Sequence, residues 1–206
     1  MQGSKQNRQL IFLVSVGMMA ALVFVGNYLQ FKIPVAIGSV TRVHLGNSMC
    51  LLAGLLFGPM TGGLASGIGA GLFDLLDPMY ITSAPYTFFS KFVMGFLAGW
   101  IARGALTMDG KNRLFRLIIG GVTGQIAYMI LYLGKSFVEL VLVGNPVQTA
   151  LVAVLPKVAT SGFNALAAVV ISVPLSIALY QALKRTGFST LMTGEKKQKS
   201  NPYAAG

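Results

Sequence analysis

The sequence predicts an all-α integral membrane protein with six transmembrane helices and both termini in the cytoplasm. Three observations lead to this fold class. Only 10% of the 206 residues are charged and 54% are hydrophobic, with a mean hydropathy of +0.71, whereas a soluble domain carries roughly 25% charged residues. Uncharged runs long enough to form membrane helices alternate with short polar segments. Inside these runs glycines recur four residues apart, which is the spacing of closely packed membrane helices.

Four helices are expected in the first half of the chain. The uncharged run that follows Arg8 is long enough to span a bilayer. A second uncharged run, residues 45–73, is interrupted near its middle by Gly58-Pro59. Glycine often ends a helix and proline often begins one, so we expect two helices folded back on each other. The expected ranges are about 10–30, 45–57, 61–76 and 86–102.

The second half of the chain predicts two further transmembrane helices, about residues 114–133 and 158–183. Between them, Asn145-Pro146 has the pattern of an N-cap followed by proline at the first helical position. This pattern predicts a short helix to about residue 155. Pro156 is expected to break that helix and Pro174 to kink the last one, because proline lacks the N–H that an interior turn needs.

The basic residues set the expected orientation. With both termini inside, 11 of the 16 basic residues lie on the cytoplasmic side and 5 lie outside, in agreement with the positive-inside rule. A seventh span over residues 138–155 would place the basic C-terminal tail outside, so we exclude it. The net charge of +11 is therefore a signal of topology, and no nucleic-acid partner is expected.

The chain is expected to form one membrane domain with two polar ends. The expected parts are a cytoplasmic N-terminal segment 1–9, a six-helix substrate-binding domain 10–185 and a disordered, basic cytoplasmic tail 186–206.

Small residues mark the expected helix contacts. Gly63, Gly67 and Gly71 share one face of the third helix, which predicts a tight bundle because lipid provides no hydrophobic drive for helix association. The first helix carries a single pair of this kind, Gly17 and Ala21. Two interpretations of this pair remain open, namely packing inside the protein or a flat lipid-exposed patch that docks another membrane protein.

Polar and ionisable residues gather at the expected outer rim of the bundle. Such groups are costly in a membrane and usually face a cavity or the bundle interior. Asp74 ends an apolar helix and is expected either to line a cavity or to pair with Arg42 or Lys91. For Lys32, Lys135 and Glu139 we favour snorkelling to the membrane surface. The candidate substrate-binding residues are Asn27, Arg42, His44, Asn47, Asp74, Tyr86, Lys91, Tyr128 and Asn164.

The sequence contains no catalytic or metal-binding pattern, since HExxH, GxSxG and Walker A motifs are all missing. We therefore expect neither an enzyme nor a cofactor. Inverted repeats, which many secondary transporters have, are also missing. The favoured interpretation is a protein that binds a solute and passes it to partners that supply energy. A self-sufficient secondary transporter and an assembly protein without a ligand remain as alternatives.

Three segments carry a family resemblance: LGNSMCLLAGLLFGPMTGGLASGIGAGLFDLL, APYTFFSKFVMGFLAGWIA and NALAAVVISVPLSIALYQALKR. With them, residues 10–185 resemble the substrate-binding S components of energy-coupling factor (ECF) vitamin transporters, in the branch that includes the hydroxymethylpyrimidine and pyridoxine S components. The resemblance implies an outward cavity capped by the loop 31–43. It also implies a complex with a membrane coupling (T) protein and two cytoplasmic ATPases, in a bacterial plasma membrane.

The same resemblance bears on docking and on the substrate. The family docks through an Ala-xxx-Ala motif on its first helix, which corresponds here to Gly17 and Ala21 and favours the docking interpretation. A pyrimidine or pyridine heterocycle is the first expected substrate, because planar rings stack on aromatic side chains. A larger vitamin such as cobalamin or riboflavin is the alternative, in a cavity walled by Gly67 and Gly71. The expected stacking residues are Tyr80, Tyr86, Phe88 and Tyr128.

Overall fold

The computed structural model describes residues 2–35 and 39–185, and this part of the chain forms six α-helices and one two-stranded hairpin. The helices are α1 (Gln2–Tyr28), α2 (Gly46–Phe57), α3 (Pro59–Leu76), α4 (Ala84–Ile101), α5 (Gly110–Leu142) and α6 (Val147–Arg185). The all-α prediction is confirmed. The hairpin, which the sequence did not predict, pairs β1 (Gln30–Val35) with β2 (Ser39–His44) in antiparallel fashion. Residues 36–38 and the predicted tail 186–206 lie outside the described residues.

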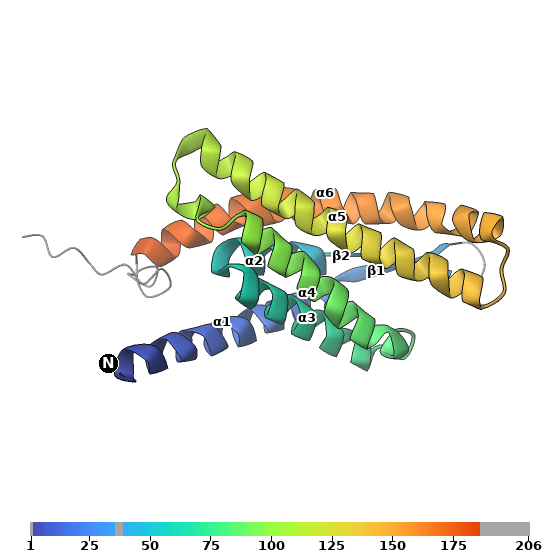
Figure 1. Ribbon diagram of the computed structural model, residues 1–206, viewed down its shortest axis with the longest axis horizontal. Coiled ribbons are helices and arrows are strands. Elements are labelled where there is room, and N and C mark those ends of the chain that lie inside the picture. The colour runs from blue at the N-terminus through green and yellow to red at the C-terminus, as the bar shows by residue number, and fades with distance from the viewer. Residues whose placement is uncertain (1, 36–38, 186–206) are drawn as a thin grey trace, which may run out of the picture.

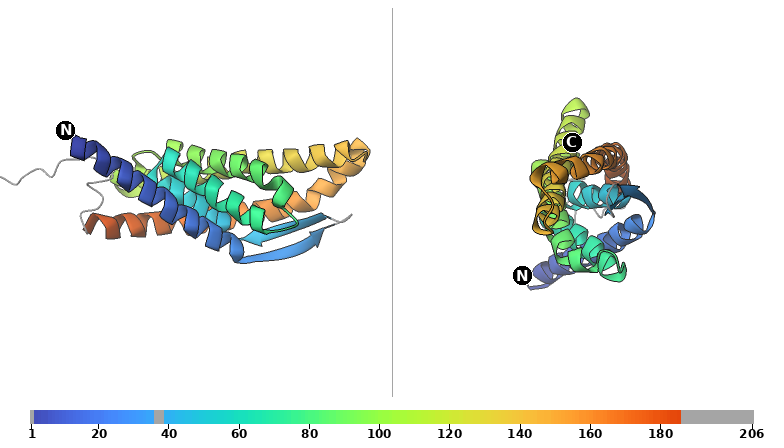
Figure 2. Two further views of the ribbon diagram at one scale, coloured as in Figure 1. Left: turned by 90° about the horizontal axis from the view of Figure 1, so that it is seen from below. Right: turned by 90° about the vertical axis from the view of Figure 1, so that its right-hand side faces the viewer.

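The helices are arranged around α2 (Figures 1 and 2). Ten of the 12 residues of α2 are buried, and it contacts each of the other five helices. The start of α1 and the end of α6 lie at the same end of the molecule. The hairpin and the connection between α5 and α6 lie at the opposite end.

The break between α2 and α3 occurs where the sequence predicts it. Gly58 has a φ of 86°, a conformation that favours glycine because it has no Cβ. Pro59 then opens α3 at a position where its missing N–H costs nothing. The two helices therefore fold back on each other within a single turn.

Glycine lets α2, α3 and α4 approach to backbone contact. An added Cβ at Gly62 would overlap the backbone of Gly54, and one at Gly95 would overlap the carbonyl of Gly62. The predicted stripe of Gly63, Gly67 and Gly71 packs on the rings of Phe92 and Phe88 of α4. These glycines make the closely packed part of the bundle, as the spacing predicts.

The last third of the chain differs from the prediction. The helix α5 continues to Leu142, and α6 runs unbroken from Val147 to Arg185 through Pro156 and Pro174. The predicted break at Pro156 is wrong. Buried residues on both sides of Pro156, Ala153 and Lys157 among them, hold the helix in place, so packing overrides the local cost of proline.

Both of these helices are longer than a bilayer requires. At about 1.5 Å per residue the 33 residues of α5 extend about 50 Å, against a hydrocarbon core of about 30 Å. Within residues 2–35 and 39–185, three helical segments are long and apolar enough to cross a membrane, namely Gln6–Tyr28, Gly110–Leu142 and Val147–Arg185. The surplus length of α5 and α6 extends past the shorter helices and contributes to the walls of the site described below.

We expect Gly62→Ala to destabilise the protein by about 1–3 kcal/mol, because the new methyl group meets rigid backbone atoms. Gly134→Ala is the matched control, since an added Cβ there has no atom within 4 Å. Thermal unfolding in detergent micelles measures both variants. Equal melting temperatures for the two would show that the contact of α2, α3 and α4 is not tight.

Candidate functional site

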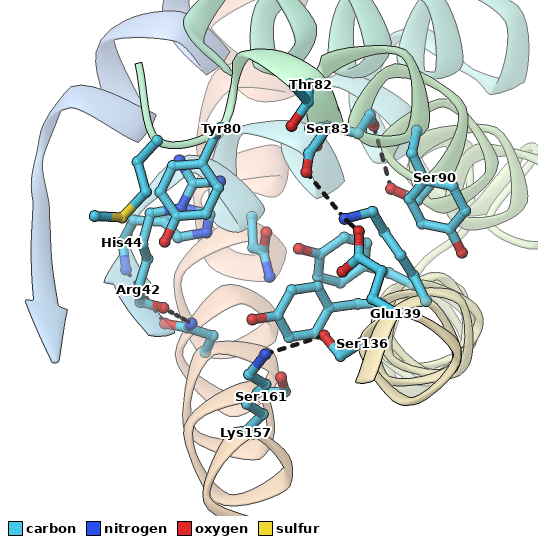
Figure 3. A pocket seen from close by; sticks show the side chains of 18 residues that line it. Arg42, His44, Tyr80, Thr82, Ser83, Ser90, Ser136, Glu139, Lys157 and Ser161 are labelled. Carbon is cyan, nitrogen blue, oxygen red and sulfur yellow. Dashed lines mark hydrogen bonds and ion pairs between the residues drawn. The ribbon is translucent and has the colours of Figure 1, made fainter. Parts of the chain in front are cut away.

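A polar cavity of about 360 Å³ lies at the end of the bundle that carries the hairpin (Figure 3). Its walls come from β2, the start of α2, the α3–α4 connection, the start of α4 and the surplus lengths of α5 and α6. Hydroxyl, amide and charged groups dominate the lining. The lining residues are Arg42, His44, Asn47, Met79, Tyr80, Thr82, Ser83, Tyr86, Thr87, Ser90, Tyr128, Tyr132, Lys135, Ser136, Glu139, Lys157, Ser161 and Asn164.

The structure brings together most of the candidate residues. Six of the nine line the cavity, namely Arg42, His44, Asn47, Tyr86, Tyr128 and Asn164. The other three, Asn27, Asp74 and Lys91, are not part of the lining. Asn27 is buried near the end of α1, where its side-chain amide donates to the carbonyl of Val23 at 2.9 Å.

Asp74 lies behind the cavity wall and holds Arg42. Its carboxylate accepts from Nη1 of Arg42 at 2.9 Å and from the hydroxyl of Thr87 at 2.6 Å. Asp74 is almost fully buried. Burial alone disfavours the charged guanidinium of Arg42, but the Asp74 carboxylate outweighs it and raises the pKa of Arg42. Of the roles that the sequence left open for Asp74, the ion pair with Arg42 is the one formed.

Arg42 is also fixed by two other contacts. Its guanidinium lies over the ring of Tyr80, 3.8 Å from the ring centroid, in a cation–π arrangement. Its backbone carbonyl accepts from the side-chain amide of Asn164 at 2.7 Å, and the oxygen of the same amide accepts from the N–H of His44 at 3.3 Å. Asn164 therefore attaches β2 to α6.

Lys91 supports the floor of the cavity from behind. Its ammonium donates to the side-chain oxygen of Asn47 and lies over the ring of Tyr128, 4.0 Å from the centroid. Asn47 in turn donates to Gln125 at 3.4 Å. Lys91 is only 2% exposed. It does not line the cavity itself but contacts Asn47 and Tyr128, which do.

His44 is held as a neutral imidazole. Burial, followed by the charges of Lys91 and Arg42, lowers the pKa of His44 well below its ordinary value. Its Nδ1 is buried and has no hydrogen-bond partner among the described residues. A neutral ring in this position can donate to or accept from a solute but adds no positive charge.

Of the lining residues on α5 and α6, sequence reasoning chose only Tyr128 and Asn164 as candidates and missed the others. Lys135 and Glu139, which we assigned to snorkelling, line the cavity as an ion pair of 2.6 Å. Lys157 reaches across to the hydroxyl of Ser136 at 3.3 Å (Figure 3). The sequence does contain a signal for this wall. When α5 and α6 are given their observed lengths, the lining residues recur three or four positions apart, on one face of each helix. These residues are Tyr128, Tyr132, Lys135 and Glu139 on α5, and Lys157, Ser161 and Asn164 on α6.

The aromatic wall also differs in part from the prediction. Tyr80, Tyr86 and Tyr128 line the cavity, together with Tyr132, whose ring stacks on Tyr128 with centroids 5.8 Å apart. Phe88 does not line it and stacks on Phe92 instead. The expectation that Gly67 and Gly71 wall the substrate cavity is wrong, since both glycines pack against Phe88.

The hairpin has a second ionic contact outside the cavity. Lys32 pairs with Asp77 at 2.7 Å. Burial raises the pKa of Asp77, but the hydrogen bonds from Lys32 and from the N–H of Met79, together with the charges of Lys32 and Arg42, outweigh it and lower the pKa below its usual range. Both strands are thus attached to the end of α3, with β1 held through Lys32 and β2 through Arg42.

Gly17 and Ala21 are not part of the cavity lining and lie on an exposed face of α1. An added Cβ at Gly17 would meet no atom within 4 Å. Of the two interpretations of this pair, packing inside the protein does not hold. Large apolar side chains around it, Val14 and Met18 among them, are also exposed.

Comparisons with known proteins give three findings. The family described as ECF-type riboflavin transporter, S component, matches residues 9–181. A solved structure of the S component of a bacterial ECF transporter has a similar fold, with a TM-score of 0.55 and 20% identity, covering 86% of this chain and 98% of that chain. An uncharacterised protein of Pyrococcus woesei is 30% identical over 107 residues, which span 52% of this chain and 66% of that protein.

We expect Asp74→Asn to lower the free energy of unfolding by about 3 kcal/mol, because it leaves the charge of Arg42 unpaired in a largely buried position. Asp109→Asn is the matched control. Asp109 is exposed and precedes α5 without a side-chain capping bond, so its change is expected to stay within about 0.5 kcal/mol. Thermal unfolding of both variants tests the difference. Similar small effects would mean that Asp74 is solvated.

Acid is expected to destabilise the protein through His44, the only histidine of the chain. Its folded pKa lies below the unfolded value of about 6.5. As the pH falls through about 6.5, the unfolded chain therefore takes up a proton before the folded protein does, and stability is lost. Melting temperatures between about pH 5 and pH 7 should fall for the wild type and change less for His44→Gln. Parallel curves would count against a buried neutral His44.

Proposed function

This chain belongs to the family of ECF-type riboflavin transporter S components, and we propose that it captures a vitamin-sized heterocycle outside the cell for import. The polar cavity at one end of an apolar bundle carries this proposal. Its volume of about 360 Å³ falls within the range of about 300–1,000 Å³ that small-molecule sites occupy. Tyrosine rings offer stacking surfaces, and hydroxyl and amide groups offer hydrogen bonds that fix the orientation of a ligand.

A flavin-sized ligand is now the first candidate for the solute. The family description favours it over the hydroxymethylpyrimidine and pyridoxine branch of the sequence resemblance, and a smaller pyrimidine or pyridine remains compatible with the stacking surfaces. The volume of the cavity argues against a corrinoid such as cobalamin, which is too large to be enclosed there. The proposed substrate contacts are the six candidate residues in the lining, with Asp74 and Lys91 supporting them from behind.

The proposed orientation places both termini in the cytoplasm and the cavity outside, with six helices in the membrane. The start of α1 and the end of α6 lie at one end of the molecule, as an even number of spans requires. The cavity lies at the other end. The chain has no Walker A motif, so ATP hydrolysis would come from a membrane coupling protein and two cytoplasmic ATPases in the cell membrane.

Two experiments test this function against a self-sufficient transporter. Mass spectrometry of small molecules that co-purify with the protein should identify a heterocyclic vitamin. Uptake in reconstituted vesicles should require the coupling protein, the ATPases and ATP. Uptake by the isolated protein in response to a proton gradient would support a secondary transporter, and the absence of both ligand and uptake would refute a transport role.

Docking to the coupling protein is expected to use the exposed small-residue pair of α1. Gly17→Leu and Ala21→Leu should abolish ATP-dependent uptake, because a bulky side chain prevents close approach of another helix. Solute binding by the isolated protein should be unchanged. Gly134→Leu, at an exposed glycine of α5, is the control and should transport normally. Normal uptake by both α1 variants would place the docking face elsewhere.

A further inference from the structure

The cavity and the residues directly behind it carry more positive than negative charge. The cations are Arg42, Lys91, Lys135 and Lys157, and the carboxylates are those of Asp74 and Glu139. His44 is neutral and adds none. With four cations and two carboxylates, the site has an excess of two positive charges.

Two of these cations are neutralised locally and two are not. Arg42 pairs with Asp74 at 2.9 Å and Lys135 pairs with Glu139 at 2.6 Å. Lys157 donates to the hydroxyl of Ser136, and Lys91 donates to the amide oxygen of Asn47. Within the described residues, neither Lys157 nor Lys91 has a carboxylate within salt-bridge distance.

The chain offers these lysines no other acid in its described part. Residues 2–35 and 39–185 contain four acidic side chains, namely Asp74, Asp77, Asp109 and Glu139. Asp77 is engaged by Lys32, and Asp109 is exposed in the connection between α4 and α5. Every acid near the cavity is therefore already in an ion pair.

Of the two lysines without a nearby carboxylate, Lys157 is the one that lines the cavity. It lines the cavity and is only 9% exposed, whereas the side chain of Glu139 is 55% exposed. Water screens the exposed carboxylate far more than the buried ammonium. A buried ammonium without a counter-charge is unfavourable unless an anion joins it.

Two serines of the cavity lining neighbour Lys157. Ser161 lies one turn further along α6, and Ser136 faces Lys157 from α5 (Figure 3). One ammonium and two hydroxyls can donate together to the oxygens of a carboxylate or a phosphate. Tyrosine rings line the same cavity, Tyr128 and Tyr132 on α5 and Tyr80 and Tyr86 in or near the start of α4.

We propose that the solute carries an acidic group, a carboxylate or a phosphate, which binds to Lys157, Ser136 and Ser161 while its ring system stacks on the tyrosines. This inference rests on the proposed function and narrows the class of solute. A neutral solute would leave the ammonium of Lys157 without a carboxylate or other anion within salt-bridge distance. An acidic solute completes the charge balance of the cavity.

Titration calorimetry of the full-length protein in detergent tests this with matched pairs of compounds. The pairs are riboflavin and riboflavin 5′-phosphate, pyridoxine and pyridoxine 5′-phosphate, and nicotinamide and nicotinic acid. In at least one pair the acidic member should bind about tenfold more tightly or better, which corresponds to about 1.4 kcal/mol. The first two pairs report a phosphate and the third reports a carboxylate, so the pattern separates the two acids.

Substitutions test whether Lys157 causes the preference for the acidic compound of each pair. Lys157→Gln should remove most of the advantage of the acidic member, whereas Lys184→Gln, at an exposed lysine in the last turn of α6, should keep it. Without solute, Lys157→Met should melt at the same temperature as the wild type or higher, because it removes a buried charge that lacks a counter-charge. This measurement needs no ligand, and it checks whether the buried ammonium of Lys157 lacks a nearby carboxylate.

Several outcomes would overturn the inference. Neutral members that bind as tightly as acidic ones in every pair would do so, as would an unchanged preference in Lys157→Gln or a marked loss of stability in Lys157→Met. In the first two cases the binding function still stands, because solutes bind, and the third case leaves it untouched, because that measurement uses no solute. If a folded protein binds no member of any pair and supports no uptake with its partners, the proposed function fails and the inference fails with it.

Discussion

The ion pair between Arg42 and Asp74 is the interaction on which the cavity depends. Arg42 belongs to the hairpin, and its side chain is held by the buried end of α3, while its backbone carbonyl is held by Asn164 of α6. One residue thus joins two helices that are far apart in the sequence. A charged group held between a carboxylate and an aromatic ring has little freedom to move. The position of the hairpin, and with it one wall of the cavity, follows from this arrangement.

Different interactions determine the structure at the two ends of the molecule. At the closely packed end, glycines bring the backbones of α2, α3 and α4 together, and dispersion contacts between them replace the missing hydrophobic drive in lipid. At the other end, α5 and α6 continue past their neighbours with polar side chains facing inward. Tight packing leaves no room for a ligand, and the polar cavity lies where the short helices end.

Function in this protein is distributed over two separate surfaces. We propose that the cavity selects a solute through hydroxyl groups, tyrosine rings and an excess of positive charge. The small residues of α1 lie on an outer face where nothing in the described chain covers them. We propose that this face meets the coupling protein. Because the surfaces do not overlap, a change in one can leave the other intact, and the binding and transport activities can be measured separately.

The sequence by itself determined the all-α class, the break at Gly58-Pro59, the glycine contacts and most of the cavity residues that come from β2, α2 and α4. Each of these follows from local properties, namely hydropathy, spacing and the conformational range of glycine and proline. The tertiary structure alone decided that Asp74 pairs with Arg42, that Phe88 turns away from the cavity and that α6 continues through Pro156. Proline weakens a helix locally, but packing against α5 keeps it intact. Contacts between helices also place Lys157 and Ser161 in the cavity wall, and local sequence patterns do not encode such contacts.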